Sequence, residues 1–150
     1  MPACLSVSLA TLLLGALAPG EPAVAQSAHT IAMGQTVAGR LTRSDRYQER
    51  DSTYVQAWSI AGTAGRTVTV DLESDEFDAY LFVAGPGIAE PLQDDDSGGH
   101  CNARITLTFP RTAQYLIVVT STNHGATGRF ALRVTSGATP KSLARCAGDR

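Results

Sequence analysis

The stretch ESDEFDAYLFVAGPGIAEPLQDDDSGG, residues 73–99, decides the fold. It places a short apolar run, Tyr80 to Ala84, between two clusters of acidic residues. An apolar run of this length, bounded by turn residues, is typical of a strand that is buried on both faces, and the Gly85-Pro86-Gly87 sequence ends it. We therefore expect a central strand with a rim of carboxylates.

The neighbouring strands follow from hydrophobic alternation. Residues 67–72 and 104–109 alternate with a period of two, which predicts half-buried strands in which Thr69 and Asp71 face outward. Residues 114–120 are apolar on both faces and predict a second central strand. Further strands are expected at residues 37–41, 54–60 and 129–135, whereas the charged segment 42–52 is expected to be a loop.

These short strands, with turn signals at regular spacing and no convincing helix after residue 25, indicate an all-β fold. We predict an antiparallel β-sandwich of about seven to eight strands. The hydrophobic pattern alone leaves open whether the topology is a Greek key or a jelly roll.

The N-terminal 25 residues have the features of a signal peptide. Residues 5–18 are apolar, and Ala23-Val24-Ala25 resembles a cleavage site, so we expect cleavage after Ala25 and a single domain over residues 26–150. The protein would then be exported, to the periplasm or the extracellular medium. Of the three cysteines, Cys101 and Cys146 would remain, and in an exported protein such a pair predicts a disulfide.

The charge balance excludes a general affinity for nucleic acid. Removing the leader takes away Glu21, one of 14 acidic residues, and none of the 12 basic ones, so the formal charge changes from −2 to about −1. A nearly neutral chain does not attract a polyanion. We expect a monomer that does not associate with the membrane once the leader is removed.

The acidic rim is the candidate metal site. Calcium prefers six to eight oxygen ligands, and loop carboxylates with backbone carbonyls can supply them. The candidate ligands are Asp75, Asp78, Asp94, Asp95 and Asp96. In the alternative interpretation, residues 94–99 form a solvated turn in which the aspartates cap their own backbone.

No catalytic residues are predicted. The chain contains neither the G-x-S-x-G motif of many serine hydrolases nor the H-E-x-x-H motif of zinc peptidases. The acidic clusters could supply a pair of carboxylates for glycoside hydrolysis, but a chain this short lacks the insertions that form a substrate cleft.

In order and spacing, several segments over residues 34–135 resemble the bacterial pre-peptidase C-terminal domain. These are V-x-G-x-L from Val37, the WSIAG and TVTVDLES sequences, FDAYLFVAGPG, the DDD loop, QYLIVV and GRFAL. The resemblance implies a jelly-roll-like β-sandwich that serves as an accessory module of secreted peptidases. Related modules include collagen-binding ones, some of which bind calcium. We expect a stand-alone copy without a peptidase domain. The family commonly has a glycine before the tyrosine of the sixth strand, where this chain has Thr112-Ala113-Gln114-Tyr115.

Two functions are compatible with these features. The first is a non-catalytic exported binding or accessory module for a protein or polysaccharide ligand, with a secreted peptidase acting in trans as one candidate partner. The second is a structural or assembly domain of the cell envelope with no ligand. A small secreted hydrolase is a distant third. An exposed apolar patch on one sheet face would favour the binding module.

Overall fold

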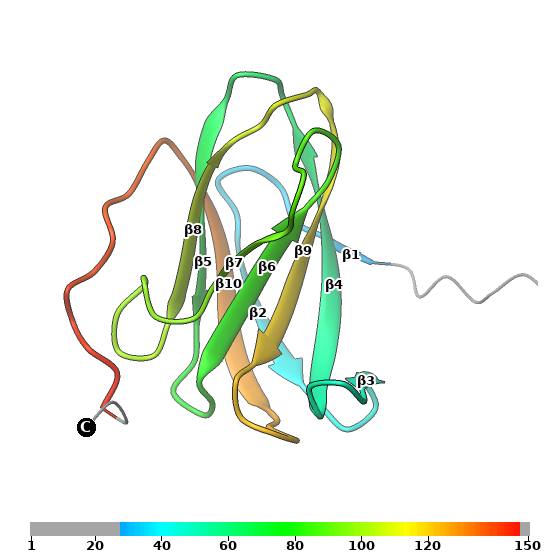
Figure 1. Ribbon diagram of the computed structural model, residues 1–150, viewed down its shortest axis with the longest axis vertical. Coiled ribbons are helices and arrows are strands. Elements are labelled where there is room, and N and C mark those ends of the chain that lie inside the picture. The colour runs from blue at the N-terminus through cyan, green and yellow to red at the C-terminus, as the bar shows by residue number, and fades with distance from the viewer. Residues whose placement is uncertain (1–27, 148–150) are drawn as a thin grey trace, which may run out of the picture.

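The computed structural model describes residues 28–147, which form a two-layer β-sandwich (Figure 1). The predicted signal peptide lies outside these residues. One sheet has the order β2 (Thr36–Leu41), β10 (Gly128–Ser136), β5 (Thr67–Glu73) and β8 (Ala103–Thr108). The other has the order β1 (His29–Thr30), β4 (Thr53–Gly62), β9 (Ala113–Ser121), β6 (Ala79–Ala84) and β7 (Leu92–Asp94), and β3 (Arg46–Gln48) pairs with β4.

The strand order is that of a jelly roll. If the short strands β1 and β3 are set aside, the remaining eight strands form two sheets of four, β2-β10-β5-β8 and β4-β9-β6-β7. Every pairing among these eight strands is antiparallel, whereas β1 pairs with β4 in parallel. The predicted all-β, jelly-roll-like sandwich is therefore confirmed. Over residues 28–147 no helix is long and apolar enough to cross a membrane.

The core lies between the two sheets and consists of the inward-facing residues of each strand. Because side chains alternate between the two faces of a strand, every second residue of β5, β6, β9 and β10 enters it. These residues are Val68, Val70, Leu72, Ala79, Leu81, Val83, Tyr115, Ile117, Val119, Phe130, Leu132 and Val134, and all are at most 6% exposed. Trp58 of β4 also packs in this core.

Tyr115 anchors one end of the sandwich. Its ring lies 4.7 Å from that of Phe109, and its hydroxyl donates a hydrogen bond to the carbonyl oxygen of Pro86 at 3.0 Å. Two glycines make room for it, since a Cβ atom added to Gly85 would lie 2.4 Å from the Tyr115 ring and one added to Gly62 would lie 2.7 Å from it. This close packing fixes the loop after β6 against β9.

The segment 42–52, predicted to be a loop, contains the short strand β3. β3 pairs with β4 so that Tyr47 lies opposite Tyr54, with ring centroids 5.1 Å apart. The prediction was wrong because the partner of Tyr47 lies across a hairpin, where periodicity along the chain does not reveal it. β1 and β7 also escaped prediction, because two or three residues are too few to show a period.

The prediction that the strand at residues 80–84 is buried on both faces was also wrong, whereas the prediction that it and the strand at residues 114–120 are central is confirmed. Within residues 28–147, no second layer covers the outward side chains of β6 and β9. Tyr80 and Phe82 are only partly buried, and Leu116 is 40% exposed. The opposite error concerns Thr69 and Asp71, which were expected to face solvent but are 0% and 4% exposed because the C-terminal segment packs over them.

Candidate functional site

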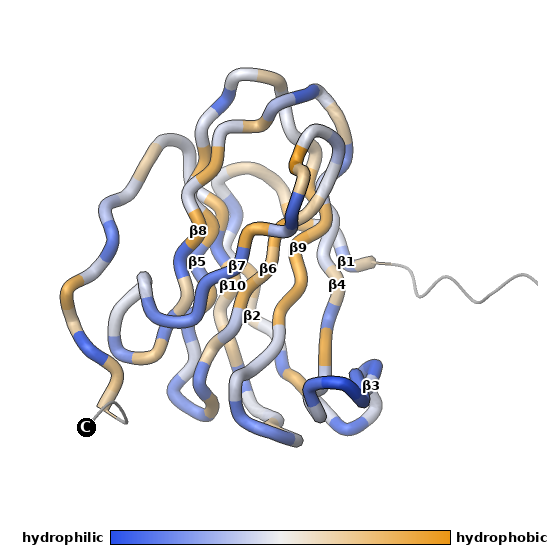
Figure 2. Tube along the Cα trace, viewed as in Figure 1, coloured by the Kyte–Doolittle hydropathy of each residue, from blue (hydrophilic) through white to orange (hydrophobic). Residues whose placement is uncertain are grey.

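The outward side chains of β4, β9, β6 and β7 form one largely apolar surface, which we call the outer sheet face. Strand register builds it row by row. Phe82 lies opposite Val118, Val118 lies opposite Ala57, and Gln93 lies on the other side of Phe82. Figure 2 shows the hydrophobic character of β6 and β9 and the hydrophilic hairpin around β3. The central row thus crosses all four strands and is apolar at three of its four positions.

The neighbouring rows extend the apolar surface. Ala84 lies opposite Leu116, and Tyr80 lies opposite Thr120. The rings of Tyr80 and Phe82 are 4.4 Å apart between centroids and tilted by 49°. Contiguous exposed apolar surface is uncommon on a protein that works alone, and it often marks a binding site.

The outer sheet face is hollowed rather than flat. A hollow of about 570 Å³ is lined by strand residues that include Tyr80, Phe82 and Leu116. The hairpin between β3 and β4 contributes Arg50 and Asp51 to its wall. The sequence predicted the strands beneath this hollow but not the hollow itself, because the hairpin was interpreted as a loop without a position relative to the sheet.

Tyr80 lies at the acidic end of the hollow. Its hydroxyl donates a hydrogen bond to Gln93 Oε1 at 3.0 Å. Burial of the ring raises the pKa of Tyr80 above its ordinary value, and the negative charges of Asp95 and Asp51 raise it further. Both carboxylates therefore act electrostatically on this ring, although Asp51 comes from the hairpin between β3 and β4 and Asp95 from the loop between β7 and β8.

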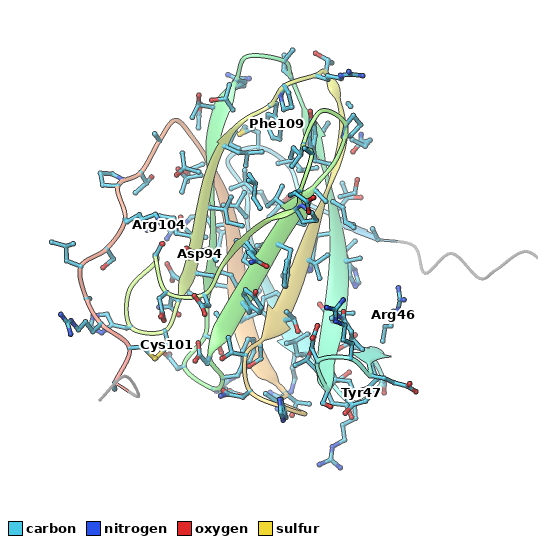
Figure 3. All side chains as sticks on the ribbon, viewed as in Figure 1. Arg46, Tyr47, Asp94, Cys101, Arg104 and Phe109 are labelled. Atoms are coloured by element: carbon cyan, nitrogen blue, oxygen red, sulfur yellow. A yellow bond between two sulfur atoms is a disulfide. The ribbon has the colours of Figure 1, made fainter. Side chains whose placement is uncertain are left out.

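Asp94, a predicted calcium ligand, holds the loop between β7 and β8 together (Figure 3). Its Oδ2 atom accepts hydrogen bonds from the backbone N–H groups of Ser97 and Arg104, both at 2.9 Å, and its Oδ1 atom accepts one from the Ser97 hydroxyl. A calcium ligand needs lone pairs directed at the ion. This pattern of donors is that of a capped turn, the alternative to a metal site.

The other predicted ligands lie in different places. Asp75 and Asp78 border a separate hollow of about 490 Å³ beside Cys101 and Cys146, and Asp95 acts on Tyr80. Within residues 28–147, one group of three ligand-type side chains has its ligand atoms within 4.8 Å of one another, and it comprises Asp78 and the two cysteines. Because these sulfurs form a disulfide, they are not thiolate ligands. Calcium binding by the five aspartates stays a prediction.

Cys101 and Cys146 are joined in a disulfide across 45 positions of sequence, with Cα atoms 4.5 Å apart. The disulfide fixes residues 137–147, which we call the C-terminal strap. The strap lies beside β8 in Figure 1 and is bonded to the sheet through Thr139, whose N–H donates to Thr69 Oγ1 at 2.9 Å. The Ser142 N–H donates to the Ser97 carbonyl oxygen at 2.8 Å.

An ion pair lies under the strap. Arg104 Nε is 2.6 Å from Asp71 Oδ1, and the Arg104 guanidinium also donates to the Pro140 carbonyl oxygen of the strap at 2.7 Å. Arg133 approaches the other Asp71 oxygen at 3.8 Å. Arg104 and Asp71 thus bond to each other and to the strap, whereas the buried Nε atom of Arg133 has only the longer ion pair with Asp71.

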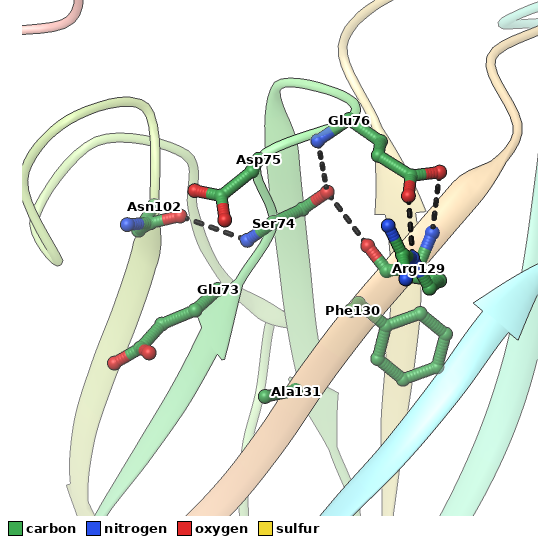
Figure 4. Close-up of a pocket in the computed structure, with 8 residues that line it drawn as sticks. All are labelled: Glu73, Ser74, Asp75, Glu76, Asn102, Arg129, Phe130 and Ala131. Carbon is green, nitrogen blue, oxygen red and sulfur yellow. Dashed lines mark hydrogen bonds and ion pairs between the residues drawn. The ribbon is translucent and has the colours of Figure 1, made fainter.

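A third hollow, of about 430 Å³, lies where β5 leads into β6 (Figure 4). Ser74 organises it, donating its hydroxyl to the Arg129 carbonyl oxygen at 2.8 Å and its N–H to Asn102 Oδ1 at 3.0 Å. Glu76 pairs with Arg129 at 2.6 Å, and the hydrogen bond from that guanidinium lowers the pKa of Glu76 below its ordinary value. The polar groups of this hollow bond mainly to one another, which is typical of a structural network.

Comparison with known proteins gives similarity of structure only. No family model matches the chain, and no curated protein matches it in sequence. The pre-peptidase C-terminal domain of a collagenase from Bacillus anthracis is similar at a TM-score of 0.56 and 12% identity, covering 72% of this chain and 94% of that one. A periplasmic inhibitor of g-type lysozyme from Salmonella Typhimurium is similar at a TM-score of 0.50 and 12% identity, covering 74% of this chain and all of that one.

At 12% identity these similarities show the fold and nothing finer. They agree with the β-sandwich that the sequence predicted, and one of the two similar structures belongs to the family that the sequence resembles. Fold alone does not determine function, because unrelated sites can occur on one scaffold. The function must therefore be argued from the surfaces of this chain.

Proposed function

We propose that this protein is a non-catalytic, exported binding module that binds another protein through the outer sheet face. The observation that carries the proposal is the exposed apolar surface over β6 and β9, where a sheet buried on one side would ordinarily present polar residues. Tyrosine, phenylalanine and leucine side chains left partly exposed in a hollow are suited to a protein interface.

A protein ligand is favoured over a polysaccharide by the composition of the outer sheet face. Its central rows present mainly alkyl side chains, such as Leu116, Val118 and Ala84, whereas sugar hydroxyls require many hydrogen-bonding partners. The periplasmic lysozyme inhibitor shows that a sandwich of this fold can be used in protein recognition. A secreted peptidase acting in trans stays one candidate partner.

Export is supported by the disulfide between Cys101 and Cys146, because disulfides persist in oxidising compartments and are rare in the cytosol of most organisms. A non-catalytic role is supported by the similar structures, which are a pre-peptidase C-terminal domain and an inhibitor. The serine of the predicted turn at residues 94–99, Ser97, donates its hydroxyl to Asp94 and so stabilises the loop.

Site-specific crosslinking tests the proposal. A photoreactive residue placed at Leu116 should crosslink a protein partner in the native exported fraction, whereas the same residue at Thr108, exposed on the other sheet, should not. The partner would be identified by mass spectrometry and purified, and its affinity measured. Leu116→Glu should then weaken binding at least about tenfold, because it places a charge in an apolar interface.

Three results would count against the proposal. Equal crosslinking from positions 116 and 108 would indicate non-specific contact, and unchanged affinity of Leu116→Glu would place the interface elsewhere. If position 116 crosslinks nothing in the compartment where the protein works, the alternative of an assembly domain without a ligand gains.

A further inference from the structure

The aromatic corner of the outer sheet face is formed by Tyr80 and Phe82. These residues are two positions apart on β6, so both point to the same side of the sheet. Their rings lie 4.4 Å apart at 49° and both line the hollow. The hydrogen bond from the Tyr80 hydroxyl to Gln93 of β7 restrains the tyrosine ring, so the pair forms an ordered aromatic surface.

Two carboxylates flank this corner from opposite sides. Asp51 lies two residues before the start of β4, and Asp95 immediately follows β7. These two strands lie on opposite sides of β6 in the sheet. Strand register places both at the same end, because Leu81 lies opposite Asp94 on one side and opposite Val119 on the other, and Val119 lies opposite Gln56 of β4. Continued by one residue, the antiparallel register of β6 and β7 brings Asp95 to the position opposite Tyr80.

The electrostatics agree with this placement. Asp95 and Asp51 both raise the pKa of Tyr80, which means that their negative charge is felt at its hydroxyl. Arg50 also lines the hollow and is the positive charge that a cationic ligand would meet there. The corner thus combines aromatic ring faces with negative charge supplied from two sides.

Among side chains, arginine matches this combination best. Its guanidinium is planar, stacks on aromatic rings, loses less hydration than an ammonium group and carries five donors that can reach two carboxylates at once. Lysine offers a compact charge without the planar surface, and an uncharged side chain lacks the charge–charge attraction to the carboxylates. We propose that the corner receives an arginine side chain of the partner protein, an inference that rests on the proposed function.

Small probes test this without a known partner. The ring signals of Tyr80 and Phe82 would be followed by NMR while N-acetylarginine N-methylamide is added to the protein. Isolated cation–π contacts are weak, so we expect saturable shifts in the millimolar range. The citrulline analogue, which has nearly the same shape without charge, should bind at least about fivefold more weakly, and the lysine analogue should fall between the two.

Matched variants identify the charges responsible. Asp51→Asn and Asp95→Asn should each weaken arginine binding about two- to fivefold, whereas Asp75→Asn, an exposed aspartate of the β5–β6 loop, should leave it unchanged. Arg50→Gln should strengthen binding, since it removes a competing cation.

The inference is overturned if the arginine and citrulline analogues shift the ring signals alike, if neither shifts them, or if lysine binds as well as arginine. An oligosaccharide that shifts these signals where the arginine probe does not would also overturn it. Crosslinking from position 116 distinguishes the failure of this inference from the failure of the proposed function. If position 116 still crosslinks a partner but the arginine probe does not bind, the outer sheet face remains the proposed binding surface and only the arginine site is rejected.

Discussion

At the residue scale, Asp94 shows how one carboxylate can determine a loop. It stands at the end of β7 and accepts three hydrogen bonds, two of them from Ser97 and one from the backbone of Arg104 at the start of β8. Arg104 in turn pairs with Asp71. Asp94 therefore connects the edge strand of one sheet to the edge strand of the other.

Replacing this carboxylate separates its role in the turn from any role in metal binding. Asp94→Ala leaves three donors without their acceptor, and we expect it to lower the free energy of unfolding by about 1–3 kcal/mol in excess EDTA. Thermal and urea unfolding measure this change. Unaltered stability in EDTA would contradict the turn role. Calcium binding, if it occurs, would add a rise in the wild-type midpoint in millimolar calcium that the variant lacks.

At the element scale, the sequence predicted what depends on periodicity. The seven longer strands over residues 36–136 were predicted within a few residues because each alternates or is continuously apolar. The hydrophobic pattern of β6 and β9 could not distinguish a strand covered by a second layer from a strand with an exposed apolar outer face, since each kind of strand has apolar side chains on its two faces. For this reason the exposure of Leu116, on which the candidate site depends, could not be predicted.

Contacts between distant segments could not be predicted. The burial of Thr69 depends on Thr139, 70 positions later in the chain, and nothing in the alternation of β5 indicates a covering segment. The hairpin that walls the hollow depends on the pairing of Tyr47 with Tyr54, which a local pattern does not show. The acidic residues could be identified in the sequence. Only the fold showed that they lie in three different places, a turn, a hollow and the aromatic corner.

Packing between β6 and β9 gives a prediction at the same scale. A Cβ atom on Gly85 would lie 2.4 Å from the Tyr115 ring, which is itself fixed between Phe109 and the Pro86 carbonyl. Gly85→Ala should therefore lower the free energy of unfolding by about 1–3 kcal/mol, as overpacking does in other cores. Urea unfolding would show this, with Ala84→Ser as the control, because the Ala84 side chain points outward and the change should stay within about 0.5 kcal/mol.

At the scale of the whole molecule, the two sheets have different outer surfaces. The sheet β2-β10-β5-β8 carries the C-terminal strap over the polar side chains of β5 and β8. The sheet β4-β9-β6-β7 leaves an apolar hollow without a covering segment in the part of the chain that the structure describes. The strap therefore covers one face with the protein's own chain, and the proposed function assigns the other face to a partner.

Opening the disulfide tests this division. In the Cys101→Ser, Cys146→Ser double variant the 45-residue connection is no longer closed in the unfolded chain, so the free energy of unfolding should fall by about 4 kcal/mol on the chain-entropy model. Hydrogen exchange should accelerate at the backbone amides of Gly137, Thr139 and Ser142, which bond to the sheet and to the 97–101 loop. The ring signals of Tyr80 and Phe82 should keep their positions and their response to the arginine probe, because the strap lies on the opposite sheet. A changed response would show instead that the two faces are coupled, and the strap would then be part of the binding site.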